Sequence, residues 1–342
     1  MKKTVAVVKR QVLYKCKWGL MALIVFAMAA AGCSDLSSEQ EAKKAVSTGG
    51  NEQESRSGDE EKGTEKAQGA EDADQTDEET ETADVSEKAQ IEEQVLLEQD
   101  GVKITLKELD ADGFMGPELK LLIENNSDQN LTVQTHDTSV NGIMVETLFS
   151  CEVAAGKSAN EGIAFMGSDL DEAQINVLQN FEFGFHIINT ESWDTVFDSE
   201  VITVSTNLDG SEEQVVDDSG VLLLDQDNVK ITVKEVDDKN SFWGADIYIY
   251  VENNTDKSIS VQASSVSIDG FMVEPYFSCE VAPGKKSYDT ITFMEEELKE
   301  NNIESIDNME VSFSVSDAES YETILETEPL KVEFESADTD NQ

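Results

Sequence analysis

The feature that most constrains this chain is an internal repeat. A stretch beginning at Leu96 and Leu97 recurs at Leu223 and Leu224, an offset of 127 residues. After one inserted residue the offset becomes 128, and the run 142–157 then reappears as 270–285. Repeats of solenoid proteins are about 20 to 50 residues long, so a repeat of this size predicts two copies of a whole domain.

Each copy has the pattern of an all-β domain. Leu119, Leu121 and Ile123 alternate with more polar positions, which is the period of a half-buried strand. Asn-Gly at 141–142 and Asp-Gly at 269–270 supply the backbone conformation of tight hairpin turns. Short acidic pieces at 169–174 and 295–300 are the expected helices. Seven or eight strands in about 110 residues predict a two-sheet β-sandwich in each copy, module 1 at 95–205 and module 2 at 221–333.

The remaining segments differ in composition from the two modules. Residues 33–94 contain no aromatic side chain and are rich in Glu, Asp, Ser and Thr, so a disordered acidic tether is expected there. An acidic connector at 206–220 and a short tail at 334–342 complete the chain.

The first 32 residues have the organisation of an export signal. Six Lys and Arg precede an uncharged stretch from Trp18 to Ala31, which is too short to span a bilayer comfortably. Ala30, Ala31, Gly32 and Cys33 resemble the lipobox of bacterial lipoproteins, although Ala30 stands where that family usually has Leu. The resemblance implies cleavage before Cys33 and a palmitate-type lipid anchor on Cys33, on the extracytoplasmic face of the membrane. A plain signal peptide or an uncleaved anchor is the alternative.

A second resemblance concerns the modules. The Asn-Asn pairs at 125–126 and 253–254, the Gly-Lys turns at 156–157 and 284–285 and the Phe-rich closing strands look like the tandem immunoglobulin-like domains of unknown function in lipoproteins of Gram-positive bacteria. The resemblance implies the fold and the location, and it brings no catalytic residues.

Charge and residue usage exclude several classes of function. The formal net charge is −49, from 73 acidic and 24 basic residues, so the chain lacks the basic surface that nucleic-acid binding needs. His136 and His186 have Ser264 and Ser314 as their counterparts, which argues against shared catalytic machinery. No cofactor is expected, and an extracytoplasmic hydrolase is the least favoured hypothesis.

Cys151 and Cys279 occupy the same place in the two copies, on the face of a strand that also carries Phe149 in module 1. They are therefore expected to be buried free thiols, with a bridge between chains or modules as the alternative.

A calcium site is a separate hypothesis for this acidic chain. Asp110 and Asp112, with Asp237 and Asp238, are weak candidate ligands, because neither pair begins a complete calcium-binding loop, and the linker acids Asp217 and Asp218 are a third possibility.

One loop in each copy carries large apolar residues, namely Phe114 and Met115 in module 1 and the aromatic pair Phe242 and Trp243 in module 2. It joins strands at one end of the sandwich, where binding loops of such folds lie. The aromatic pair either contacts a surface protein or a glycan, or caps the core. The sequence thus predicts a membrane-anchored, non-catalytic binding or structural protein, and the alternative is an accessory solute- or calcium-binding component of a membrane machine.

Overall fold

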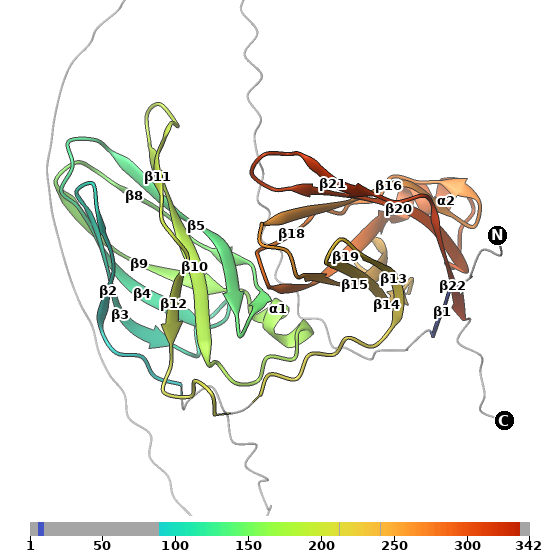
Figure 1. The fold of residues 1–342 in the computed structure, drawn as a ribbon, viewed down its shortest axis with the longest axis horizontal. Helices are drawn as coiled ribbons and strands as arrows, with labels where there is room; N and C mark the ends of the chain where they lie inside the picture. Colours follow the sequence, from blue (N-terminus) through green and yellow to red (C-terminus); the bar gives the residue numbers. More distant parts are fainter. Residues whose placement is uncertain (1–5, 10–88, 212, 240, 336–342) are drawn as a thin grey trace, which may run out of the picture. The chain divides into compact units, whose positions relative to one another are not determined.

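A computed structural model describes residues 6–9, 89–211, 213–239 and 241–335, all of which belong to one compact unit. The described chain is almost entirely β-strand and forms two consecutive β-sandwiches (Figure 1). The predicted all-β fold is therefore confirmed. Cys33 and most of the expected signal segment and tether lie outside the described residues. Within the described part of the chain, no helix is long and apolar enough to cross a membrane.

Module 1 has two sheets. The first has the strand order β2-β3-β4-β9-β7. Its strands are β2 (Gln94–Gln99), β3 (Val102–Asp110), β4 (Glu118–Asn125), β9 (Lys157–Phe165) and β7 (Thr147–Leu148). In the second sheet β5 pairs with β8, β6 and β10, and β10 pairs with β11 and β12. These strands are β5 (Leu131–Val140), β6 (Ile143–Met144), β8 (Ser150–Val153), β10 (Asn180–Asn189), β11 (Thr195–Asp198) and β12 (Ile202–Ser205).

The connectivity is that of an immunoglobulin-like sandwich. Strands β3, β4, β9 and β7 lie in the order A-B-E-D, and β5, β10 and β12 lie in the order C-F-G on the opposite sheet. The helix α1 (Gly167–Glu172) connects β9 with the strand that crosses to the other sheet. The chain of module 1 therefore passes repeatedly between the two sheets, and residues far apart in sequence meet across the core.

Module 2 repeats this arrangement. One sheet runs β13-β14-β15-β19, and in the other β16 pairs with β17, β18 and β20, while β20 pairs with β21 and β22. The first set is β13 (Val221–Gln226), β14 (Val229–Asp237), β15 (Gly244–Asn253) and β19 (Lys286–Met294). The second set is β16 (Ile259–Ile268), β17 (Phe271–Met272), β18 (Cys279–Val281), β20 (Asn308–Asp317), β21 (Thr323–Glu326) and β22 (Leu330–Glu335), and α2 (Glu295–Glu300) matches α1.

An additional strand, β1 (Ala6–Lys9), runs parallel to β22, with Ala6 opposite Val332 and Lys9 opposite Glu335. These residues belong to the expected signal segment. Processing before Cys33 would remove β1 and leave the outer edge of β22 without this partner.

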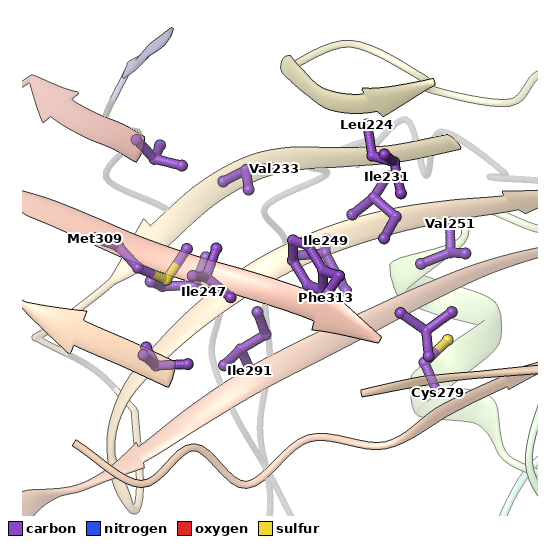
Figure 2. Close-up of a cluster of buried hydrophobic side chains, with 14 of the residues drawn as sticks. Leu224, Ile231, Val233, Ile247, Ile249, Val251, Cys279, Ile291, Met309 and Phe313 are labelled. Atoms are coloured by element: carbon purple, nitrogen blue, oxygen red, sulfur yellow. The ribbon is translucent and has the colours of Figure 1, made fainter. Parts of the chain in front are cut away.

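The two modules bury separate cores of different composition. Figure 2 shows the core of module 2, where Ile247, Ile249, Ile291 and Val251 from one sheet face Met309 and Phe313 from the other. Module 1 fills the corresponding space with aromatic rings from β9 and β10, namely Phe165, Phe181, Phe183 and Phe185, all fully buried.

The alternation of buried and more exposed residues that was predicted around Leu119, Leu121 and Ile123 is confirmed, since all three side chains are buried.

The predicted turns and helices are also present. Asn141 and Gly142 have φ angles of +52° and +79°, and Asp269 and Gly270 have +50° and +87°, values that suit the tight turns for which these residues are favoured. The helices begin and end within two residues of the acidic pieces from which they were expected.

Module 1 begins earlier than expected from composition. Ala89, in the segment expected to be a disordered tether, is buried in the module 1 core. The amide of Asn207 donates a hydrogen bond to the carbonyl of Gln90, and the amide of Gln90 donates to the side-chain Oδ1 of Asn207. In the acidic connector, Leu208 and Val216 also pack against that core. Both ends of module 1 are therefore held by a few apolar residues in otherwise polar segments.

Candidate functional site

The loop between β14 and β15 presents two aromatic side chains to solvent. Phe242 is 77% exposed and Trp243 is 45% exposed, and their rings are 5.0 Å apart in an edge-to-face arrangement. Phe114, in the matching loop of module 1, is 86% exposed, and Met115 is half-buried. Phe114 and Phe242 therefore do not cap a core.

Matched backbone contacts hold both loops in place. The amide of Glu295 donates a hydrogen bond to the carbonyl of Trp243 at 2.7 Å, and Gly167 donates to Met115 at 2.8 Å. A glycine with a positive φ follows in each loop: φ is +137° at Gly116 in module 1 and +151° at Gly244 in module 2. A Cβ at Gly244 would lie only 2.4 Å from the backbone of Glu295, so glycine is required for this close approach.

The loop of module 2 borders a pocket of about 480 Å³. Apolar groups of Phe242, Leu298, Ile303 and Ile306 line it together with the charged side chains of Asp238, Lys239, Glu295, Lys299 and Glu304. The hydroxyl of Ser241 is buried at this pocket and has no hydrogen-bond partner among the described residues. The combination of apolar lining with a few polar groups is typical of binding sites.

The weak calcium candidates do not converge in either loop. The amide of Asp112 donates to the Asp110 carboxylate, and the amides of Lys239 and Ile306 donate to Asp237 and Asp238. These carboxylates organise the backbone of their own loops, as Asp does in many turns. The described residues contain no group of three or more acidic, His or Cys side chains that would hold a metal ion.

In the described part of the chain, each histidine pairs with a carboxylate and neither hydrogen-bonds to a hydroxyl or thiol side chain. Nδ1 of His136 lies 2.9 Å from Asp137, which raises the pKa of His136, and the imidazole of His186 pairs with Asp198. The nearby hydroxyl of Ser258 donates to Asp137 at 3.2 Å rather than to the imidazole. This geometry does not activate the hydroxyl, because in a catalytic triad the base that takes its proton is the histidine.

Cys151 and Cys279 are buried and unpaired, as predicted. Burial raises the pKa of both thiols, that of Cys279 well above its usual value. A protonated, enclosed thiol is a poor nucleophile, so these residues act as small core side chains.

A second pocket, of about 430 Å³, lies where the modules meet, and Glu146, Asp169 and Asp289 line it. Burial raises the pKa of all three carboxyls, and repulsion from neighbouring carboxylates adds to the effect at Glu146 and Asp289. The carboxylate of Asp169 also accepts a hydrogen bond from the backbone amide of Glu146, at 2.8 Å. The sequence gave no sign of this pocket, because its residues come from both modules.

Comparisons with known proteins add little beyond the fold. No protein-family model matches the chain, and no curated protein matches it. The YadV chaperone crystal structure has 11% identity and a TM-score of 0.20, covering 63% of this chain and 91% of that one. A Salmonella enterica SafA pilin in complex with the SafB chaperone has 12% identity and a TM-score of 0.17, with coverages of 63% and 88%. Similarities this distant do not bear on function.

Proposed function

We propose that this protein is a lipid-anchored surface protein that binds another protein without catalysing a reaction. The observation that carries the proposal is the exposed Phe242–Trp243 pair beside a pocket on a β-sandwich. Large aromatic side chains dominate the binding energy of protein interfaces, and exposed apolar side chains that lie together mark interaction sites.

Further apolar side chains extend the surface available to a partner. Asp238 accepts from Ile306, and Asp269 accepts from Asn308, so the loops at 238–243, 269–272 and 301–307 lie at one end of module 2. The loop at 269–272 carries Phe271 and Met272, both exposed. A protein surface with apolar side chains would bury several of these groups together, whereas a small solute would bury only one or two.

Site-specific photocrosslinking in cells that make the protein tests this function. A photoreactive phenylalanine at position 242 is expected to form an adduct with a second protein, which mass spectrometry identifies. The same residue at position 114 of module 1 is the matched control, because Phe114 is equally exposed but lacks an aromatic neighbour such as Trp243. A glycan adduct, or equal adducts from both positions, would contradict the proposal of a protein partner at module 2.

Replacing Phe242 with Ala is expected to weaken binding of the identified partner by at least about tenfold, since hot-spot residues contribute about 2 kcal/mol or more. The stability of the folded protein is expected to change by less than about 0.5 kcal/mol, because the side chain is largely exposed. Titration calorimetry and urea denaturation measure the two quantities. Loss of stability without loss of binding would assign Phe242 a structural role instead.

The anchoring part of the proposal rests on Cys33 and the residues that precede it. Replacing Cys33 with Ala is expected to abolish incorporation of labelled fatty acid, because the thiol is the only attachment point in the lipobox. Replacing Cys16 with Ala is the control and is expected to leave labelling unchanged. Labelling that persists in the Cys33→Ala variant would contradict the lipoprotein assignment.

A further inference from the structure

The contact between the two modules uses one end of module 1 and one strand of module 2. Lys285 forms an ion pair with Glu182, and the amide of Lys286 donates to the carbonyl of Gly142 at 3.2 Å. Met144 packs against the core of module 2, and Tyr288 packs against the core of module 1. We call the surface of module 1 around Gly142, Met144 and Glu182 the acceptor face. We call the surface of module 2 around Lys285, Lys286 and Tyr288 the donor face.

Because the modules are repeats, each carries both faces. The acceptor face of module 1 contains Gly142, Met144 and Glu182, and the same residue types stand 128 positions later in module 2 as Gly270, Met272 and Glu310. Ser139, which donates to Glu182, likewise corresponds to Ser267. Asp137, which accepts a hydrogen bond from Ser258 across the contact, has Ser265 as its counterpart. The acceptor face of module 2 therefore keeps the glycine, methionine, glutamate and serine of module 1 but not this carboxylate.

This second acceptor face is open. Met272 is 66% exposed and Phe271 is 48% exposed, whereas Met144 is half-buried against module 2. Glu310 is exposed, and Lys331 lies opposite it on the neighbouring strand. The apolar residues that module 1 uses for its contact with module 2 thus lie unused on module 2 itself.

The donor face of module 1 is open as well. Lys157 corresponds to Lys285 and is exposed at the start of β9, where it has no ion pair among the described residues. Asn160 stands where Tyr288 lies in module 2. The charged part of the donor face is therefore kept in module 1, and its aromatic part is lost.

We propose that copies of this chain associate head to tail, with the acceptor face of module 2 in one copy receiving the donor face of module 1 in the next. The new contact repeats the contact between the modules, with Lys157 paired to Glu310 of the adjacent copy. It joins two different faces, so a single contact between two copies leaves one face of each kind free for a further contact.

This association is weaker than the contact within the chain. The connector gives the two modules of one chain a high effective concentration, which two copies reach only when they are crowded on a membrane. The donor face also carries Glu152 and Glu161, and the acceptor face carries Glu274 and Glu297, so like charges oppose the contact. Physiological salt screens such charges over about 8 Å, and the experiment is therefore done at that ionic strength.

The test uses two full-length copies with different tags, made in the same cells and isolated in mild detergent. Wild-type copies are expected to co-purify. When both copies carry Glu310→Lys, or both carry Lys157→Glu, like charges meet and co-purification is expected to fall about tenfold. When one copy carries Glu310→Lys and the other Lys157→Glu, one orientation of the pair keeps the wild-type contact and the other restores it in reversed polarity, so co-purification is expected to return.

Glu98→Lys makes the same change of net charge on the exposed strand β2 and is the control, which is expected to behave as wild type. The proposal is overturned if wild-type copies do not co-purify, if the variants co-purify like wild type, or if the mixed pair is not restored. Phe271 and Met272 also belong to the surface that we propose for a protein partner, so the identity of the crosslinked protein separates the two proposals. An adduct of position 242 with a different protein supports the proposed function, and an adduct with a second copy of this chain would instead place self-association at that loop.

Discussion

Replacing Asn253 with Ala is expected to lower the free energy of unfolding by about 3 kcal/mol. The side chain is fully buried, and its Nδ2 donates to the carbonyls of Lys257 and Val281, both at 2.7 Å. Its Oδ1 accepts from the amide and the hydroxyl of Thr255 at 3.0 and 2.7 Å. Alanine would leave these groups buried without partners, at about 1 to 3 kcal/mol for each group that water does not reach.

The expected loss is large because Asn253 connects the two sheets. It lies at the end of β15, whereas Val281 ends β18 on the opposite sheet. Urea denaturation measures the change, and the adjacent Asn254→Ala is the matched control. Asn254 makes one exposed side-chain hydrogen bond, to Glu252, so its replacement is expected to cost less than about 0.5 kcal/mol. Equal effects of the two substitutions would contradict the role given to Asn253.

Replacing Phe183 with Ala is expected to lower the stability of module 1 by about 3 to 5 kcal/mol, the usual range for removing a buried aromatic ring. Phe183 is fully buried, with ring centroids 5.4 Å from Phe185 and 6.3 Å from Phe165. The residue of module 2 that is equivalent to Phe183 is Val311, so the aromatic cluster belongs to module 1 alone. Calorimetry of the full chain should show a melting transition displaced to lower temperature.

The control for this substitution is Trp193→Ala, which removes an exposed ring between β10 and β11 and is expected to have little effect. The two variants separate loss of core packing from loss of aromatic surface in general. If both shift the transition equally, the aromatic cluster does not stabilise module 1 in the way its burial indicates.

Several features of the structure could be predicted from the local sequence. The Asn-Gly and Asp-Gly turns form because their residues adopt positive φ angles at low cost, and the alternation along β4 places Leu119, Leu121 and Ile123 in the core. The burial of Cys151 and Cys279 followed from the same alternation. These properties depend on neighbours along one strand, so they are visible in the order of the residues.

Other features of the structure could not be predicted from the sequence. Asn125 and Asn253 read as ordinary turn residues, yet each hydrogen-bonds across to the second sheet, through Val153 and Val281. The burial of Ala89 depends on an apolar pocket built by strands far along the chain, and composition alone placed it in the tether. In both places the partner is distant in sequence, and no local pattern marks it.

The sequence by itself determined that the chain contains two copies of an all-β domain, because repetition and two-residue periodicity are properties of residue order. It left open whether the aromatic loops are buried, and it made the two copies look equivalent. Only the tertiary structure decided that Phe242 and Trp243 face solvent, and that Met144 is covered while Met272 is exposed. The physical reason is that identical residues differ in burial according to what packs on them, and each module has a different neighbour.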